Sequence, residues 1–391
     1  MKKVGILIDT PFSLGGVQRV STILANYLND KGFDVSFLVF KRDIRIDYDF
    51  YGLNRNVHLV RMDEYNSTVN RILRRIPSEL KKLKNRKNLF GNTLQGQLDM
   101  FAGKRDAQII AEYVNDCDLD YVIGPAIENT VRLAAARRYL KKARVIGWQH
   151  STFGAYFETP GIRMYNLDKA SEYTFKNIDR YVVLTHDDQE KIRNRFGYES
   201  IVINNPNTFS TDKRASLENK NFLAAGRFVE LKGYDRLLEA FGRFCQENDQ
   251  WKLYLVGEGP EKDRYLGLIS EYGLKDRVIM PGRTSEMEKY YLDSSIYMMT
   301  SWWEGWGMTV TEAMQYGLPV ISFDMPSIRE IFGDRECGII VEMNNTDQLA
   351  EAMKQLAADP ERMKTLGDNA VKQVAGFDSE AVCRKWLEIL K

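Results

Sequence analysis

The sequence has no apolar run long enough to cross a membrane and no paired cysteines. A spanning helix needs about 18 consecutive residues with few charges, and the 391 residues contain no such stretch. The N-terminal segment MKKVGILIDT lacks the long apolar part of a signal peptide, so we expect none. The cysteines lie far apart, which argues against a zinc or redox motif and favours four reduced thiols in a cytosolic protein. They are Cys117, Cys245, Cys337 and Cys383.

Common nucleotide-binding signatures are also missing. No Walker A pattern occurs, which argues against the usual nucleotide-triphosphate hydrolases. The segment LVGEGP at 255–260 resembles half of a dinucleotide-binding fingerprint, but Lys262 stands where that motif requires glycine. We therefore interpret Gly257 and Gly259 as parts of a tight turn between a strand and a helix.

The composition is that of a soluble globular protein with two or three domains. It is 44% hydrophobic, 28% charged and 12% aromatic. The net charge of +1 conceals an imbalance, because residues 1–200 carry +8 and residues 201–391 carry −7. We expect the first half to favour an anion or an anionic surface.

Apolar strand patterns alternate with helical patterns in both halves of the chain. In the first half we predict a helix over 17–29 and strands over 4–8, 35–40, 57–60, 121–123, 145–148 and 181–184. After the turn-rich NNPN at 204–207 we predict strands over 222–225, 253–256, 278–280, 296–300, 320–323 and 338–341. Helical stretches include 234–247, 314–316 and nearly all of 346–391. This order predicts an α/β protein with two doubly wound parallel sheets and a ligand cleft between them.

Two segments suit an anionic ligand. Gly15 and Gly16 follow the first strand and precede a helix, where free N–H groups and the helix dipole favour a phosphate. A plain turn is the alternative for this pair. In GRFVELKG at 226–233, Arg227 and Lys232 lie between a strand and a helix and suit a diphosphate, although a solvated cation pair is the alternative.

The segment EGWGMTVTEAMQYGLP at 304–319 is the most informative. Glu304 is expected on a glycine-rich loop and Glu312 one turn inside a helix, with the N–H groups of Met308 and Thr309 facing an anion. The alternative for Glu312 is a capping box formed by TVTE at 309–312.

These features resemble the retaining glycosyltransferase family 4. The resemblance rests on the E-x7-E spacing of Glu304 and Glu312, and on GGVQR at 15–19, GRFVELKG, LVGEGP and EAMQYGLPVISFD at 312–324. It implies the GT-B architecture, in which two Rossmann-like domains face each other across a cleft. The implied domains are an acceptor-binding domain over 1–205 and a donor-binding domain over 206–378. A final helix over 379–391 would cross back to the first domain.

The resemblance also assigns roles to matching residues. Glu312 would bind the ribose and Glu304 the hydroxyls of the transferred sugar. Arg227 and Lys232 would neutralise the diphosphate, with Gly15 and Gly16 closing over it. His150, in GWQHS, matches the sugar-contacting histidine of the family. Arg283, after the strand at 278–280, lies where family members hold the nucleobase.

The resemblance implies no cofactor and no metal ion. The acidic pairs at 47–49 and 116–118 have the DxD form of some metal sites, but neither has a recognisable cleft-facing setting. The nucleotide-sugar, expected to be a UDP-hexose, is a substrate.

Residues 71–87 form a basic stretch with interleaved apolar residues. Such a segment can lie on an anionic membrane surface, although a solvated helix would carry similar charges. Nucleic acid is not expected, because no stacking aromatic residues interleave with the cations. The resemblance and the basic stretch together imply a cytoplasmic hexosyltransferase that is peripheral on the inner face of the plasma membrane. It would transfer a galactose-type or glucose-type unit to a lipid-linked saccharide in the biosynthesis of bacterial surface polysaccharide. The alternative is a non-catalytic nucleotide-sugar-binding subunit of another transferase.

Overall fold

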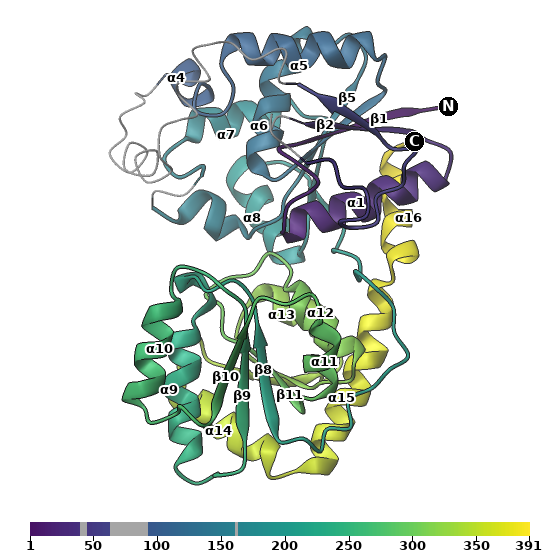
Figure 1. The fold of residues 1–391 in the computed structure, drawn as a ribbon. Helices are drawn as coiled ribbons and strands as arrows, with labels where there is room; N and C mark the ends of the chain where they lie inside the picture. Colours follow the sequence, from purple (N-terminus) through teal and green to yellow (C-terminus); the bar gives the residue numbers. More distant parts are fainter. Residues whose placement is uncertain (40–44, 63–92, 161–162) are drawn as a thin grey trace. The chain divides into compact units, whose positions relative to one another are not determined.

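The computed structural model describes residues 1–39, 45–62, 93–160 and 163–391 (Figure 1). The chain divides into two compact units. The first contains Met1–Pro206 and Ser379–Lys391, and the second contains Asn207–Asp378. Among the described residues, no helix has both the length and the apolarity that a membrane span requires.

A parallel sheet forms the centre of the first unit, with the strand order β3-β2-β1-β4-β5-β6-β7. Its strands are β1 (Lys3–Ile8), β2 (Asp34–Val39), β3 (His58–Arg61), β4 (Tyr121–Pro125), β5 (Arg144–Trp148), β6 (Arg180–Val183) and β7 (Ile201–Val202). Its helices are α1 (Gly16–Asp30), α4 (Leu94–Leu98), α5 (Lys104–Asp116), α6 (Ile127–Ala136), α7 (Asp168–Lys176), α8 (His186–Phe196) and α16 (Ser379–Ile389), with short turns η2 (Arg137–Tyr139) and η3 (Gly154–Glu158). Apart from a charged first residue in β1, β5 and β6, the strands β1, β4, β5 and β6 consist of apolar residues and glycine, as is typical of a sheet with helices on both faces.

The second unit repeats this plan with the strand order β10-β9-β8-β11-β12-β13. Its strands are β8 (Asn221–Ala225), β9 (Lys252–Val256), β10 (Val278–Gly282), β11 (Ile296–Met299), β12 (Val320–Phe323) and β13 (Gly338–Val341). Its helices are α9 (Tyr234–Cys245), α10 (Lys262–Glu271), α11 (Met287–Leu292), α12 (Met308–Gln315), α13 (Pro326–Phe332), α14 (Thr346–Ala357) and α15 (Pro360–Val374), with short turns η4 (Glu230–Lys232) and η5 (Ala375–Phe377).

Each sheet has one point where the winding direction reverses, which we call the switch point of the sheet. In the second unit β8 lies between β9 and β11, and Phe222 is in register with both Leu253 and Ile296. In the first unit β1 lies between β2 and β4 in the same way. The loops that follow the two strands on either side of a switch point, such as β8 and β11 in the second unit, leave the sheet in opposite directions. Ligands of doubly wound sheets bind in the crevice that this creates.

The C-terminal helix α16 belongs to the first unit. Its Trp386 is buried and packs edge-on against Trp148 of β5, with ring centroids 4.7 Å apart. Two hydrogen bonds hold the terminal residues. Lys2 Nζ donates to the Leu390 carbonyl oxygen at 2.9 Å, and Tyr121 Oη donates to a Lys391 oxygen at 2.8 Å. The last residues of the chain are therefore fixed beside the starts of the neighbouring strands β1 and β4.

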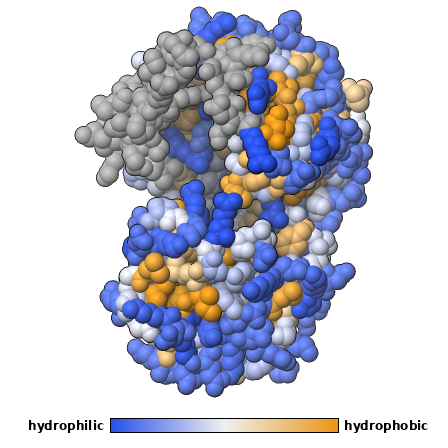
Figure 2. All heavy atoms as spheres, in the orientation of Figure 1, coloured by the Kyte–Doolittle hydropathy of each residue, from blue (hydrophilic) through white to orange (hydrophobic). Residues whose placement is uncertain are grey.

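Hydrophilic residues cover most of the visible face of the second unit, interrupted by small apolar patches (Figure 2). The four cysteines are free, as the absence of paired spacing predicted.

The structure corrects several sequence-based boundaries. The strand predicted over 296–300 ends at Met299, and β7 was not predicted. The helix expected over 314–316 is the end of α12, which starts at Met308. The capping-box interpretation of 309–312 is wrong. The N-cap residue is Gly307, with φ 80°, so Thr309 already lies inside the helix.

Candidate functional site

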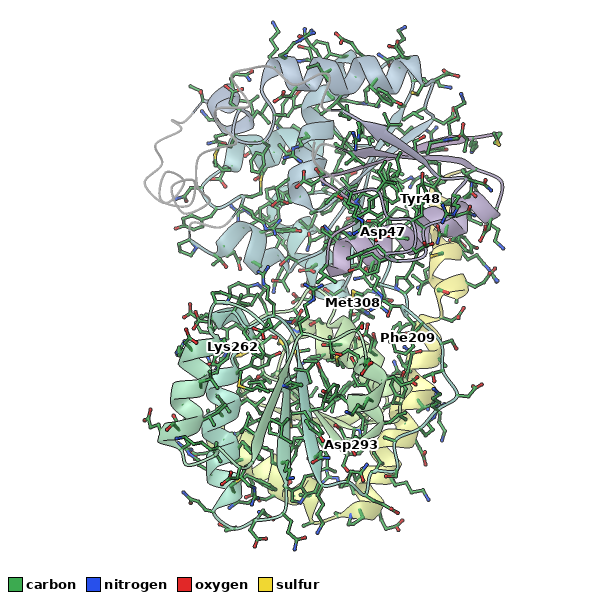
Figure 3. All side chains as sticks on the ribbon, in the orientation of Figure 1. Asp47, Tyr48, Phe209, Lys262, Asp293 and Met308 are labelled. Carbon is green, nitrogen blue, oxygen red and sulfur yellow. The ribbon has the colours of Figure 1, made fainter. Side chains whose placement is uncertain are left out.

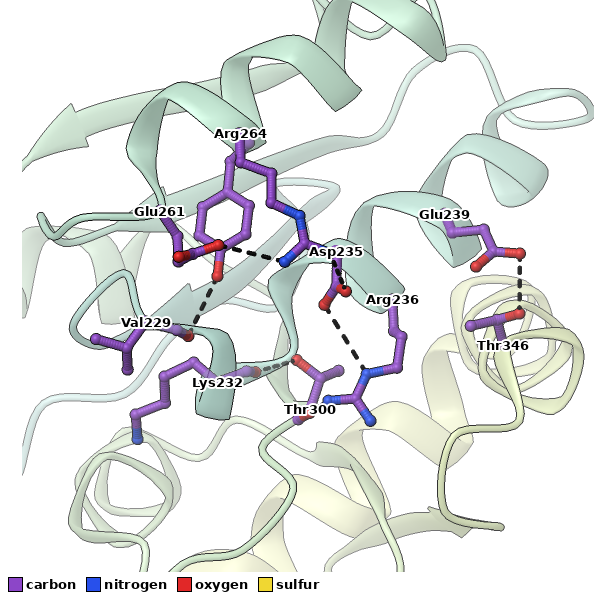
Figure 4. Close-up of polar contacts among 10 residues, drawn as sticks. Val229, Lys232, Asp235, Arg236, Glu239, Glu261, Arg264, Thr300 and Thr346 are labelled. Carbon is purple, nitrogen blue, oxygen red and sulfur yellow. Dashed lines mark hydrogen bonds and ion pairs between the residues drawn. The ribbon is translucent and has the colours of Figure 1, made fainter. Parts of the chain in front are cut away.

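The loop after β8 carries Arg227 and Lys232 and is fixed to the end of β11. Thr300 Oγ1 donates to the Lys232 carbonyl oxygen at 3.0 Å, and Arg236 Nη2 donates to the Thr300 carbonyl oxygen at 3.3 Å (Figure 4). Gly233 ends the loop with φ 61°, and a Cβ there would lie 2.2 Å from the Thr300 oxygen. Only glycine fits both this conformation and this approach. The loop is therefore held in a defined position at the switch point of the sheet.

Lys232 and Glu304 form an ion pair at this edge. Lys232 Nζ donates to Glu304 Oε1, and the side chains are 19% and 17% exposed. Ser301 Oγ, which is buried, donates to the same carboxylate oxygen at 2.9 Å. Lys232 follows β8 and Glu304 follows β11, so the contact joins the two loops that flank the switch point. Sequence reasoning identified both charged residues but missed Ser301.

Arg227 is placed differently from Lys232. Its side chain is exposed and has no hydrogen-bond or ion-pair partner among the residues that the structure describes. Arg283, just after β10, is also exposed and without a partner in the described part of the chain. Both guanidinium groups follow strands of the same sheet at its carboxyl edge and can reorient at little cost.

The glycines of LVGEGP pack against the backbone of the Arg227 loop. A Cβ on Gly257 would lie 1.9 Å from the Gly226 carbonyl oxygen, and one on Gly259 would lie 2.3 Å from the Phe228 carbonyl oxygen. Phe228 N–H donates to the Glu258 carbonyl oxygen at 2.9 Å. The missing side chains allow this close approach, which agrees with the interpretation of a tight turn.

Glu312 is buried inside α12 and holds two hydroxyl donors. The residue is 7% exposed. Thr208 Oγ1 donates to Oε1 at 3.0 Å, and Tyr291 Oη donates to Oε2 at 2.8 Å. Neither donor was identified from the sequence, because they lie 104 and 21 residues away and give no local pattern.

The start of α12 presents backbone donors. Met308, which is labelled in Figure 3, and Thr309 occupy the first two helical positions. The intrahelical hydrogen bonds begin with Val310 N–H, which donates to the Gly307 oxygen at 2.9 Å. The first N–H groups of a helix have no partner within it and carry the positive end of the helix dipole. Both residues are half-buried, so these groups lie close to the protein surface.

Gly15 and Gly16 begin α1 in the first unit. Gly15 is the N-cap residue, and its N–H donates to the Tyr51 hydroxyl at 3.1 Å. Both glycines are exposed. Tyr51 therefore occupies one of the donors that the sequence assigned to a phosphate.

His150 follows β5 in the first unit and is neutral over the physiological range. Burial, together with the positive charge of Arg163, lowers the pKa of its imidazole to about 3. Its ring lies against Trp148, with centroids 4.3 Å apart, and its Nε2 atom is buried with no partner among the described residues. A neutral imidazole can donate or accept a hydrogen bond but adds no charge.

The predicted site residues therefore fall into two groups. Arg227, Lys232, Arg283, Glu304, Met308, Thr309 and Glu312 lie in the second unit, and Gly15, Gly16 and His150 lie in the first. That the two groups act on one ligand stays a prediction. The basic segment 71–87 lies outside the described residues. Within the described ranges, no three His, Cys, Asp or Glu side chains form a group that could hold a metal ion.

Part of the chain matches a known family. Residues 207–373 fit the family model described as Glycosyl transferases group 1. This range lies within the second unit and contains Lys232, Glu304 and Glu312.

Full-length relatives are also found. An uncharacterized glycosyltransferase of Haemophilus influenzae is 28% identical over 100% of both chains. The amylovoran biosynthesis glycosyltransferase AmsD of Erwinia amylovora is 26% identical, again over 100% of both chains. A third relative, from Campylobacter jejuni, is named as an N-acetylgalactosamine-N,N'-diacetylbacillosaminyl-diphospho-undecaprenol 4-alpha-N-acetylgalactosaminyltransferase. It is 29% identical over 45% of this chain and 47% of its own length.

Solved structures share the fold over the whole chain. TarM of S. aureus, in a complex that contains UDP, has a TM-score of 0.77 at 17% identity over 100% of both chains. HepE of Anabaena, in complex with UDP-glucose, has a TM-score of 0.74 at 17% identity and covers 100% of this chain and 99% of its own. The prediction of a GT-B fold with two Rossmann-like units is confirmed. Together the family match and the relatives indicate a glycosyltransferase.

Proposed function

We propose that the protein is a retaining glycosyltransferase of family 4. It transfers a hexosyl unit, of the galactose or glucose type, from a UDP-sugar to a lipid-linked saccharide in bacterial surface polysaccharide biosynthesis. The observation that carries the proposal is the contact between Lys232 and Glu304 at the switch point of the second sheet. It brings a cation suited to a phosphate and a carboxylate suited to sugar hydroxyls together in the region that matches the glycosyltransferase family.

The donor would bind along the carboxyl edge of the second sheet. Arg227 and Lys232 contact the diphosphate, with help from the N–H groups of Met308 and Thr309. Glu312 binds the ribose hydroxyls, and Glu304 accepts hydrogen bonds from the transferred sugar. In this proposal Arg283 lies beside the base, and Gly15 and Gly16 approach the phosphates from the first unit. The UDP and UDP-glucose complexes of TarM and HepE support a uridine donor.

The transfer step exchanges one carbon–oxygen bond for another. The bond between the sugar C1 and the diphosphate oxygen breaks, and the acceptor hydroxyl oxygen forms a bond to C1 on the same face. The hydroxyl proton moves to the departing phosphate oxygen. Arg227 and Lys232 stabilise the negative charge that develops on the diphosphate, the type of help that dominates many transfer reactions. The proposal uses no metal ion, because the two side-chain cations supply this charge.

His150 would orient the sugar rather than carry charge. Its low pKa keeps the ring neutral, so it can hydrogen-bond a sugar hydroxyl without attracting the diphosphate. The buried, unpartnered Nε2 atom is the group that such a hydroxyl would satisfy.

The names of two relatives support a lipid-linked acceptor and a role in polysaccharide biosynthesis. The Campylobacter relative is named for a diphospho-undecaprenol substrate, and the Erwinia relative for amylovoran biosynthesis. An acceptor with an undecaprenyl-type carrier would hold the enzyme at the inner face of the plasma membrane. The basic segment 71–87 has the composition for that contact.

The first test is a thermal-shift panel with the full chain. UDP-, GDP-, dTDP- and ADP-sugars are compared, with NAD as the control, because a ligand that binds the folded state raises the melting temperature. We expect a selective rise with a UDP-hexose. A rise with NAD alone, or no rise with any nucleotide-sugar, would overturn the proposal. The anomeric configuration of the product, read by NMR, then tests retention.

A further inference from the structure

We propose that Tyr291 and Thr208 are positioning residues for Glu312 and that they determine the preference for a ribonucleotide donor over its 2′-deoxy analogue. The inference rests on the proposed function, in which Glu312 binds the ribose hydroxyls. It concerns two residues that lie outside the recognisable motifs of the sequence.

The two hydroxyls hold the carboxylate at both of its oxygens. Thr208 Oγ1 is 3.0 Å from Oε1, and Tyr291 Oη is 2.8 Å from Oε2. The last torsion of a glutamate side chain is broad and only weakly restricted by the chain itself. One donor on each oxygen fixes this torsion and therefore fixes the directions in which further hydroxyls can be accepted.

Tyr291 is itself held in place. It lies in α11, is 1% exposed, and stacks on Tyr316 with ring centroids 5.1 Å apart and an interplanar angle of 14°. The Tyr316 hydroxyl donates to Glu288 Oε2 at 3.2 Å. The tyrosine hydroxyl that reaches Glu312 thus comes from a packed and hydrogen-bonded position.

Thr208 is held from the other side. It is the second residue of the second unit, and its neighbour Asn207 is tied to the end of α15 and the turn after it. Asn207 N–H donates to the Phe377 oxygen at 2.7 Å, and Asn207 Nδ2 donates to the Val374 oxygen at 2.8 Å. Two separate segments, α11 and residues 207–208, therefore each donate a hydroxyl hydrogen bond to the carboxylate that α12 carries.

A fixed carboxylate discriminates between ribose and deoxyribose better than a rotating one. When the 2′-hydroxyl is missing, a fixed charged acceptor loses a hydrogen bond that it cannot replace within the complex. A carboxylate that is free to rotate can turn to the remaining hydroxyl or to water, so the loss is smaller. Removal of either positioning hydroxyl should therefore lower the selectivity as well as the affinity.

The test compares UDP with 2′-deoxy-UDP by isothermal titration calorimetry. The quantity measured is the ratio of the two Kd values in the wild-type chain, Tyr291→Phe and Thr208→Val. We expect 2′-deoxy-UDP to bind about tenfold more weakly than UDP to the wild type. In each variant this ratio should fall to about two or three, mainly because UDP binds less tightly.

Two matched controls remove the same kind of bond elsewhere in the second unit. Tyr254→Phe removes a tyrosine donor to Asp293 Oδ2 at 2.6 Å, and Thr346→Val removes a threonine donor to Glu239 Oε1 at 3.3 Å (Figure 4). Both should keep the wild-type ratio. A purely structural role for Tyr291 and Thr208 would lower the melting temperature without moving the ratio.

The outcomes separate the inference from the function on which it rests. An unchanged ratio in both site variants overturns the inference. If Tyr291→Phe does not fold, Thr208→Val decides alone. Equal binding of UDP and 2′-deoxy-UDP to the wild type overturns the ribose role of Glu312 and therefore the inference. If the wild type binds no uridine nucleotide, the proposed donor is wrong.

Discussion

Glu304→Gln should strengthen the binding of UDP while it abolishes sugar transfer. In the free protein, Lys232 is paired with Glu304. In the proposed donor complex, Lys232 contacts the diphosphate, so the ligand must compete with the carboxylate for this cation. UDP carries no hexosyl group, so it should lose no contact when the carboxylate that binds the transferred sugar is replaced. Transfer from a UDP-hexose requires that carboxylate and should be lost.

The size of the effect follows from the burial of the pair. Both side chains are less than one-fifth exposed, so the pair lies between the fully exposed and fully buried cases. Opposite unit charges 4 Å apart attract by about 4 kcal/mol at an effective dielectric constant of about 20. Desolvation offsets much of this, while exposed pairs contribute about 1 kcal/mol or less. We expect a gain of about 1–2 kcal/mol, or a Kd for UDP that is about 5- to 30-fold lower.

The assay is calorimetric titration of UDP into four chains at one fixed ionic strength. They are the wild type, Glu304→Gln, Lys232→Met and the double variant, which form a double-mutant cycle. The Glu304→Gln change should tighten the binding of UDP when Lys232 is present and should have no such effect in the Lys232→Met background. Glu247→Gln serves as the control, because it breaks a 2.6 Å pair with Lys354 between the segment after α9 and α14. Unchanged or weaker binding of UDP by Glu304→Gln would refute the competition.

Three further changes test other parts of the molecule. In Gly259→Ala the new Cβ would lie 2.3 Å from the Phe228 carbonyl oxygen, so we expect a loss of about 1–3 kcal/mol in thermal unfolding; Gly267→Ala, which meets open space, should show no loss. Burial raises the pKa of Asp188 to about 6, so the folded chain holds this proton more tightly than the unfolded chain. Stability should therefore fall by about 2–3 kcal/mol as the pH rises from about 4 to about 6, and an Asp188→Asn variant that keeps this slope in pH-dependent melting would contradict the assignment. Replacing the basic residues of 81–87 by glutamine should reduce binding to phosphatidylglycerol vesicles at low salt and spare UDP binding; equal vesicle binding would disprove the membrane contact.

The architecture was predictable because buried parallel strands leave a strong signal. Strands with helices on both faces are apolar throughout, and the runs at 4–8 and 253–256 fall inside β1 and β9. The edge strand β7 gives no such signal, because its two residues, Ile201 and Val202, are too few to show a pattern. The local sequence around α12 allowed two helix starts. Gly307, with its positive φ, provides the actual one, and a single sequence could not distinguish it from a loop glycine.

The site was predictable only where its residues lie in motifs. Glu312 was identified from its spacing to Glu304, whereas its partners Thr208 and Tyr291 come from other elements and carry no motif. Such long-range contacts depend on how helices pack on the sheet, and the order of residue types along the chain does not specify that packing.

The pairing of Lys232 with Glu304 depends on the order of the strands in the sheet. The two residues lie 72 positions apart, but their loops follow β8 and β11, which are neighbours in the sheet. The order of strands therefore brings a cation and a carboxylate to the same edge, each expected to bind a different part of one ligand. Without that ligand the two charges neutralise each other, and each is kept close to the place where it would act. The donor must therefore displace the ion pair that Lys232 and Glu304 form in the free protein, and this displacement reduces the affinity. For this reason we expect the removal of the Glu304 carboxylate to improve the binding of the product nucleotide UDP.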